Sequence, residues 1–146
     1  MLYLIGGGLI AFALLIQLVP YGRDHANPPV TQAVQWNSPR TEALARVACF
    51  DCHSNETEWP LYSNVAPMSW LTQRDVDGGR AELNFSEWDR EQEVRDVVET
   101  VQDGEMPPFG YTLAHPDARL SEQEKQELID GFIATFGDAV RNDDDD

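Results

Sequence analysis

The two cysteines of this chain are separated by two residues and followed at once by a histidine. They lie in the pentapeptide Cys49-Phe50-Asp51-Cys52-His53, and the chain has no other cysteine. Thiols three residues apart lie about one helical turn apart, so both can reach the two vinyl groups on one edge of a porphyrin. The next histidine can then bind the iron as proximal ligand. The spacing therefore predicts covalent attachment of one c-type haem.

Other uses of a C-x-x-C pair remain as alternatives. A thiol–disulfide redox pair is typical of a βαβ context, which the flanking sequence does not offer. A structural zinc ion needs four ligands, and His25 and His115 are the only histidines outside the motif. The third alternative is a coincidental match that leaves two free thiols.

The sixth iron ligand is predicted to be Met106, 53 residues after His53. It lies in a proline-stiffened loop, Gly104 to Phe109, and its thioether is soft and neutral. Methionine paired with histidine raises the reduction potential relative to two histidines. His115 is the alternative ligand, and an open site is another. Met68 is too close to His53 in sequence to reach the opposite haem face easily, and Met106 could also simply fill a gap in the core.

Further haem contacts are expected from donors and aromatic side chains. Buried carboxylates need hydrogen-bond donors, so the haem propionates should be bound by some of Tyr62, Trp59, Trp70, Arg74 and Arg80. Phe109 and the tryptophans are expected as haem walls, although each could be ordinary core. The second ring nitrogen of His53 should donate to a backbone carbonyl, for which Pro60 and Pro67 are the candidates.

The first twenty residues predict a transmembrane helix. Met1 to Val19 are almost wholly apolar, with Gln17 as the one strongly polar side chain. Nineteen helical residues at ~1.5 Å each span about the ~30 Å hydrocarbon core of a bilayer. A cleaved signal peptide is the alternative, but no basic residue precedes Arg23 and the region offers a poor cleavage site.

This anchor also predicts a location. Thioether attachment of haem takes place outside the cytoplasmic membrane, so the haem domain should face the periplasm of a single-pass membrane protein. Gly7 and Ala11 are four residues apart, a spacing that lets two membrane helices approach closely. A helix partner in the membrane is therefore a further expectation.

The charge is strongly negative. Asp and Glu number 26 against 10 Lys and Arg, a net charge of −16. This balance excludes nucleic acid as a partner and favours redox partners with basic docking surfaces. Adaptation to high salt explains the same balance equally well.

Helical signals dominate the rest of the chain, and no alternating β pattern of useful length appears. Ser38-Pro39 predicts a helix start leading into Cys49, residues 54–67 read as loop, and Ser69 predicts a second helix. Further helices are expected from Ser86 to Gly104 and, behind a Ser121–Glu124 capping box, from 121 to 137. The predicted organisation is an anchor (1–20), an extended tether (21–37), an all-α haem domain with long loops (38–137) and an acidic disordered tail (138–146).

The order of these elements resembles the class I cytochrome c pattern. More closely, the chain is similar to the small haem-binding domain family of bacterial C-x-x-C-H proteins, over roughly residues 20–136. The similarity is carried by residues 49–57, Trp59-Pro60, Tyr62-Ser63-Asn64, Ala66-Pro67, Leu83 to Trp88, Glu105 to Pro108, Tyr111, His115-Pro116 and Leu120-Ser121. This resemblance implies one haem held by Cys49, Cys52 and His53.

The expected function is electron transfer, as a carrier or as a subunit of a larger complex, rather than enzymatic catalysis. Dihaem peroxidases need two C-x-x-C-H motifs, and this chain has one. A haem-based sensor or a small haem enzyme with a labile sixth ligand is the alternative.

Overall fold

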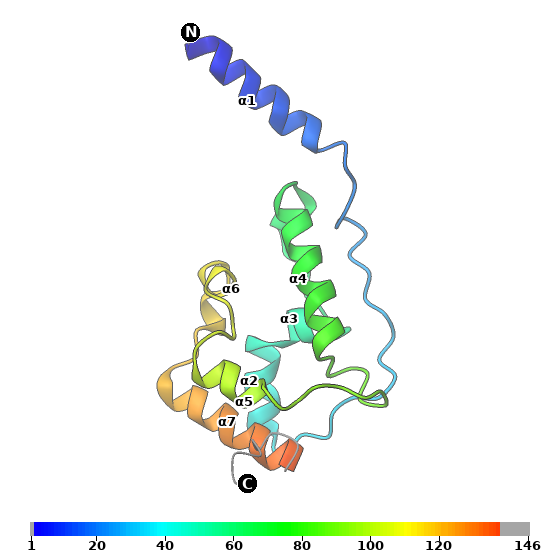
Figure 1. Cartoon of the computed structure of the whole chain (residues 1–146), viewed down its shortest axis with the longest axis vertical. Helices are drawn as coiled ribbons and strands as arrows, with labels where there is room; N and C mark the ends of the chain where they lie inside the picture. The colour runs from blue at the N-terminus through cyan, green and yellow to red at the C-terminus, as the bar shows by residue number, and fades with distance from the viewer. Residues whose placement is uncertain (1, 138–146) are drawn as a thin grey trace.

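Two helices far apart in the sequence pack together at the base of the domain. They are α2 (Pro39–Ala48) and α7 (Glu122–Phe136), and their contact is visible in Figure 1. The computed structural model describes residues 2–137, so the predicted acidic tail, 138–146, lies outside the described residues. Within 2–137 the chain is all-helical and has no strand, which confirms the all-α prediction. The other elements are α1 (Leu2–Ile16), α3 (Phe50–His53), η1 (Leu61–Asn64), α4 (Met68–Glu82), α5 (Val97–Gln102), α6 (Phe109–Ala114) and η2 (Pro116–Ala118).

The ends of α2 and α7 follow their sequence signals. Ser38 accepts a hydrogen bond from the backbone N–H of Thr41, and Pro39 occupies the first helical position. Ser121 and Glu124 form the predicted capping box at the start of α7. Gly137 follows the last turn with a φ of +62°, a conformation that glycine adopts without strain.

The helix predicted from Ser86 begins only at Val97, because residues 83–88 are used in long-range backbone pairing. The N–H of Phe85 donates to the carbonyl of His53 at 2.8 Å, and the N–H of Trp88 donates to that of Gln32 at 2.8 Å. These bonds hold the segment in turns rather than in a helix. The helix predicted at Ser69 begins at Met68, and Ser69 is buried inside it rather than capping it.

The predicted transmembrane helix is wrong. Helix α1 has 15 residues, about 22 Å of helix against the ~30 Å of a bilayer core. It ends where Gln17 turns toward the domain: its side-chain amide pairs with both backbone groups of Ala66, at 3.0 Å each, and Arg23 donates to it. Among the helices of residues 2–137, none combines the length and apolarity that a membrane crossing requires. The membrane anchor at 1–20 and the single-pass location are corrected with it, and the helix partner expected through Gly7 and Ala11 stays a prediction.

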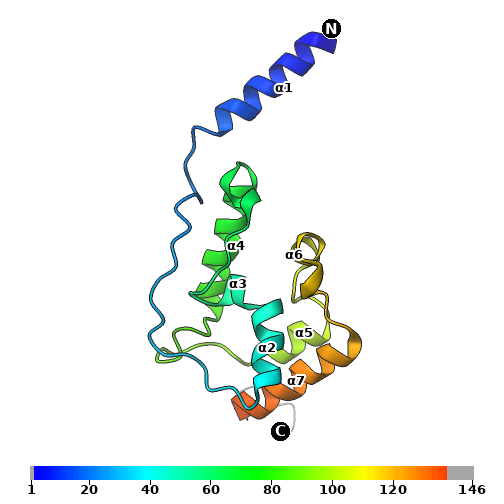
Figure 2. The ribbon, with the colours of Figure 1, turned by 180° about the vertical axis from the view of Figure 1, so that it is seen from behind.

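Residues 21–37 run as an extended segment along the side of α4 and then beneath it to α2 (Figures 1 and 2). We keep the name tether for this segment. It pairs with the segment after α4, since Thr31 and Val34 donate backbone hydrogen bonds to Ser86 and Phe85. At Gly22, φ is +76°, and an added Cβ would collide with the carbonyl of Ser69 in α4. The tether is thus packed closely on the domain.

An aromatic core underlies the C-x-x-C-H motif. Phe50, between the two cysteines, stacks on Phe85 with ring centroids 5.5 Å apart, and Phe85 meets Trp36 at 5.1 Å. Phe132 of α7 is fully buried in the same cluster. Two of the four tryptophans, Trp36 and Trp88, are partly buried and pack against this core. The motif is thus anchored through Phe50 in a cluster of well-packed aromatic rings.

Candidate functional site

The two cysteines and the histidine lie on a single turn, with Cys49 as the N-cap of α3 and Cys52 and His53 inside it. The N–H groups of Cys52 and His53 both donate to the carbonyl of Cys49, at 3.1 and 2.9 Å. Both cysteines are free. Burial raises the pKa of the Cys49 thiol to about 12 and that of Cys52 to about 11. Both sulfurs are therefore protonated thiols at neutral pH.

The ring of His53 is oriented by the end of α4. Its Nδ1 lies 3.0 Å from the carbonyl oxygen of Leu83, which can only accept, so Nδ1 carries the proton. Burial lowers the pKa of His53, which favours the neutral ring. Nε2 then keeps its lone pair for a metal. The expected acceptors, the carbonyls of Pro60 and Pro67, are wrong, because the chain passes His53 a second time at Leu83.

Helix α4 packs directly on the motif backbone at Gly79. A Cβ added at Gly79 would lie 2.5 Å from the carbonyl oxygen of Cys52, whereas one added at Gly78 would meet nothing within 4 Å. Only glycine allows this approach. Sequence reasoning missed this role, although a glycine pair inside a helix was the available signal.

The two arginines proposed for the propionates have different environments. Arg80 donates to four acceptors within the protein, including the carbonyl of Ser54 next to His53. Arg74 is exposed and pairs with its neighbour Asp75 at 2.8 Å. The guanidinium of Arg80 thus uses four of its five N–H groups within the protein, while that of Arg74 is accessible.

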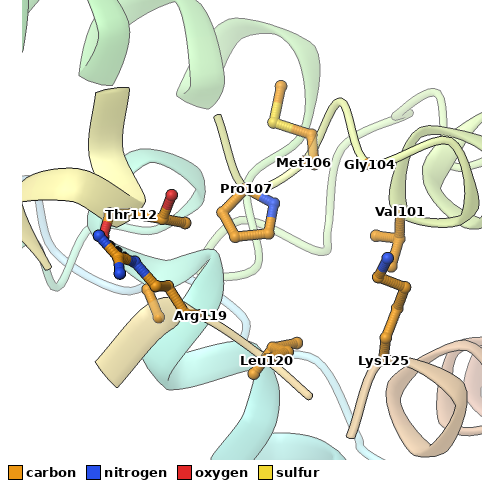
Figure 3. A pocket seen from close by; sticks show the side chains of 9 residues that line it. Val101, Gly104, Met106, Pro107, Thr112, Arg119, Leu120 and Lys125 are labelled. Carbon is orange, nitrogen blue, oxygen red and sulfur yellow. Dashed lines mark hydrogen bonds between the residues drawn. The ribbon is translucent and has the colours of Figure 1, made fainter. Parts of the chain in front are cut away.

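The loop of Met106 is held by α5. The N–H groups of Glu105 and Met106 both donate to the carbonyl of Thr100, at 2.9 and 3.0 Å. Figure 3 shows the thioether of Met106 extending away from Leu120 and Lys125, at the edge of a small pocket of about 200 Å³. The side chain is 37% exposed. The role of Met106 as a metal ligand stays a prediction.

The alternative ligand, His115, is engaged by two tyrosines. Its Nε2 lies 2.8 Å from the hydroxyl of Tyr62, and its ring stacks on Tyr111 at 4.3 Å. Tyr111 donates to the carboxylate of Asp51, between the two cysteines, at 2.8 Å. Burial, and then the bond to Asp51, raises the pKa of Tyr111 far above its ordinary value. Sequence reasoning missed Asp51 and Tyr111, which connect α6 to the motif.

The aromatic candidates are divided between the tether and the surface. Trp59 stacks on His25 at 4.8 Å and donates to Asn27, so it binds the tether. Phe109 is 78% exposed at the start of α6. The Nε1–H of Trp70 is buried and has no hydrogen-bond partner within residues 2–137, so it remains able to donate to a carboxylate.

These groups fit a haem in their chemistry. A neutral imidazole lies beside two thiols, α3 packs against α4, and α6 lies across from α4 in both views (Figures 1 and 2). Both helices carry exposed apolar side chains, among them Leu71 in α4 and Phe109 and Leu113 in α6. A buried unpaired indole N–H in α4 adds a donor.

Comparison with known families gives an independent result. The family described as a haem-binding domain matches residues 11–134, most of the chain. Searches of curated proteins and of solved structures found no significant match.

Proposed function

The chain belongs to the haem-binding domain family, and on this premise we propose that it is a c-type cytochrome that carries electrons on a single covalent haem. Haem binding follows from the family. The finer proposal is carried by one observation: the only two cysteines of the chain are unpaired thiols on the same helical turn as a neutral, oriented histidine.

The attachment chemistry needs protonated thiols beside the ring. Each thiol would add its S–H across one vinyl double bond, the sulfur going to one carbon and the hydrogen to the other. The raised pKa values of Cys49 and Cys52 support this form of the sulfur at neutral pH. They also argue against a reactive redox pair, which needs a lowered thiol pKa.

Electron transfer is supported by how the ligands are held. When bound, haem supplies a one-electron couple. The imidazole of His53 is fixed by Leu83, and the backbone of Met106 by Thr100, so a change of iron charge requires little movement of either residue. With a net charge of −16, the partners that we propose are redox proteins with basic docking surfaces.

Covalent attachment is tested by denaturing electrophoresis and acid-acetone extraction of the haem-loaded full chain. We expect haem to stay on the wild-type chain and to be lost from Cys49→Ser/Cys52→Ser. Each single variant should keep at most one thioether link. Haem that can be extracted from the wild type would overturn the proposal.

The electron-transfer role is tested by an optical redox titration and by carbon monoxide binding. We expect a reversible one-electron couple and slow carbon monoxide binding, because a protein ligand occupies the sixth position. Fast binding by the wild type would instead favour a sensor or a small haem enzyme.

A further inference from the structure

One arginine connects the haem motif, the loop after it and the tether. Arg80, in the last turns of α4, is partly buried and its guanidinium makes four hydrogen bonds. Two go to the loop that follows His53: Nε to Ser54 O at 2.8 Å and Nη2 to Thr57 Oγ1 at 2.9 Å. Two go to the tether: Nη1 to Ala26 O at 3.1 Å and Nη2 to Asn27 Oδ1 at 2.8 Å. Ser54, which directly follows His53, is therefore held by the charged guanidinium of Arg80.

All four acceptors of Arg80 are neutral. Within residues 2–137, no carboxylate lies at ion-pair distance from its guanidinium. Two carboxylates act on Arg80 through space without contacting it. Asp77 accepts hydrogen bonds from Tyr21 and Gln73, and Glu87 pairs with Arg90. Burial lowers the pKa of Arg80, but a guanidinium stays charged at any physiological pH. A positive charge without a contacting counterion is thus fixed beside the motif.

The position of this charge decides what it acts on. Arg80 directly follows Gly79, which touches the backbone of Cys52, and it bonds to Ser54, which directly follows His53. Oxidation adds one positive charge to the iron centre, and a fixed cation nearby opposes that gain. Unit charges roughly 10 Å apart at an effective dielectric constant of about 20 shift an equilibrium by on the order of tenfold.

We propose that Arg80 is a positioning residue that raises the reduction potential of the iron site by holding a positive charge without a contacting counterion beside His53. This inference rests on the proposed function. It differs from a propionate contact, because the four hydrogen bonds of the guanidinium are already made within the protein.

The test is the midpoint potential of the haem-loaded full chain, measured for two variants at one position. Arg80→Gln removes the charge, and we expect a fall of about tenfold in the equilibrium constant for reduction, which is 59 mV for one electron. Arg80→Lys keeps the charge, so its equilibrium constant for reduction should stay within about threefold of the wild-type value. The matched control is Arg40→Gln, which removes the same charge from an exposed ion pair with Glu124 and Glu127 and should leave the potential unchanged.

Two further variants separate the charge from the hydrogen bonds. Asn27→Ala and Thr57→Val each remove an acceptor of Arg80 and keep its charge, so they should lower the free energy of unfolding and retain the potential. If Arg80→Gln loses haem, the test rests on Arg80→Lys. A tenfold fall in the equilibrium constant for reduction of that variant overturns the inference. An unchanged potential in haem-loaded Arg80→Gln overturns it as well. Failure of the proposed function is distinguishable, because it appears in the wild type as extractable haem or as the lack of a reversible couple.

Discussion

The Nδ1 atom of His53 donates to the carbonyl oxygen of Leu83 across 30 positions of sequence, at 3.0 Å. Leu83 ends α4, and its own N–H donates to the carbonyl of Gly79 at 2.9 Å. Gly79 in turn contacts the backbone of Cys52. The last turn of α4 therefore determines both how close that helix lies to the motif and how the imidazole is oriented.

The glycine pair in α4 provides the first prediction. In an exposed helix interior, Gly→Ala raises stability by up to about 1 kcal/mol. We expect this gain for Gly78→Ala, since its Cβ meets nothing within 4 Å. Gly79→Ala should instead lower the free energy of unfolding by roughly 1–3 kcal/mol, because its Cβ displaces the backbone of Cys52. Urea unfolding measures both, and equal effects of the two substitutions would show that the close approach does not matter.

The second prediction concerns Met106 as an iron ligand. Met106→Ala should give a high-spin haem that binds carbon monoxide readily, and Met106→His a low-spin haem with a potential lower by ~100 mV or more. Met68→Ala is the matched control, because Met68 is similarly exposed, at 42% against 37%. It should change neither the spin state nor the potential.

His115→Ala separates the two candidate ligands. We expect some loss of stability, because the Nε2 bond to Tyr62 is lost, and an unchanged visible spectrum. If this substitution alone converts the spin state, then His115 is the ligand and Met106 only packs.

The third prediction concerns the bond between Tyr111 and Asp51. A hydrogen bond to a charged group contributes roughly 1.5–3 kcal/mol, so Tyr111→Phe should lower the free energy of unfolding by about that amount. Tyr21→Phe is the control, since the hydroxyl of Tyr21 is an exposed donor 3.3 Å from Asp77, and it should change stability little.

The pH dependence of this difference has a definite sign. Folding raises the pKa of Tyr111 above its ordinary value of 10.0, so the phenol keeps its proton in the folded protein. Its contribution is fully present below pH 10 and is lost as the pH rises above 10, where the unfolded phenol ionises. The gap between wild type and Tyr111→Phe, followed by urea unfolding, should therefore be constant from pH 7 to about 9 and shrink above 10. A gap that shrinks near neutral pH would exclude Tyr111 as its source.

Local signals in the sequence predicted what local chemistry determines. The Ser38 cap, the Ser121–Glu124 box and the stop at Gly137 each depend on a few neighbouring residues, and all three are present. The motif at 49–53 also predicted haem, in agreement with the family.

Features that depend on the path of the chain were not predictable in the same way. Every residue carries a carbonyl, so no side chain marks Leu83 as the acceptor of His53. The segment after Ser86 has helical periodicity, but its backbone pairs with the tether instead. The apolar run at the N-terminus predicted a longer helix than α1. No local signal shows that Gln17, directly after α1, pairs with Ala66, 49 positions away.

The contact between α2 and α7 provides the last prediction. A Cβ added at Gly131 of α7 would overlap the side chain of Thr41, with Cγ2 at 2.5 Å, and Thr41 is buried. We expect Gly131→Ala to lower the free energy of unfolding by roughly 1–3 kcal/mol, despite the higher helix propensity of alanine. Gly110→Ala in α6, where a Cβ meets nothing within 4 Å, should be neutral or stabilising. Thr41→Ala removes the overlapping Oγ1 and Cγ2, so the double variant should recover part of the loss. A double-mutant cycle in urea measures this coupling, and strictly additive effects would mean that the two helices do not meet at this pair.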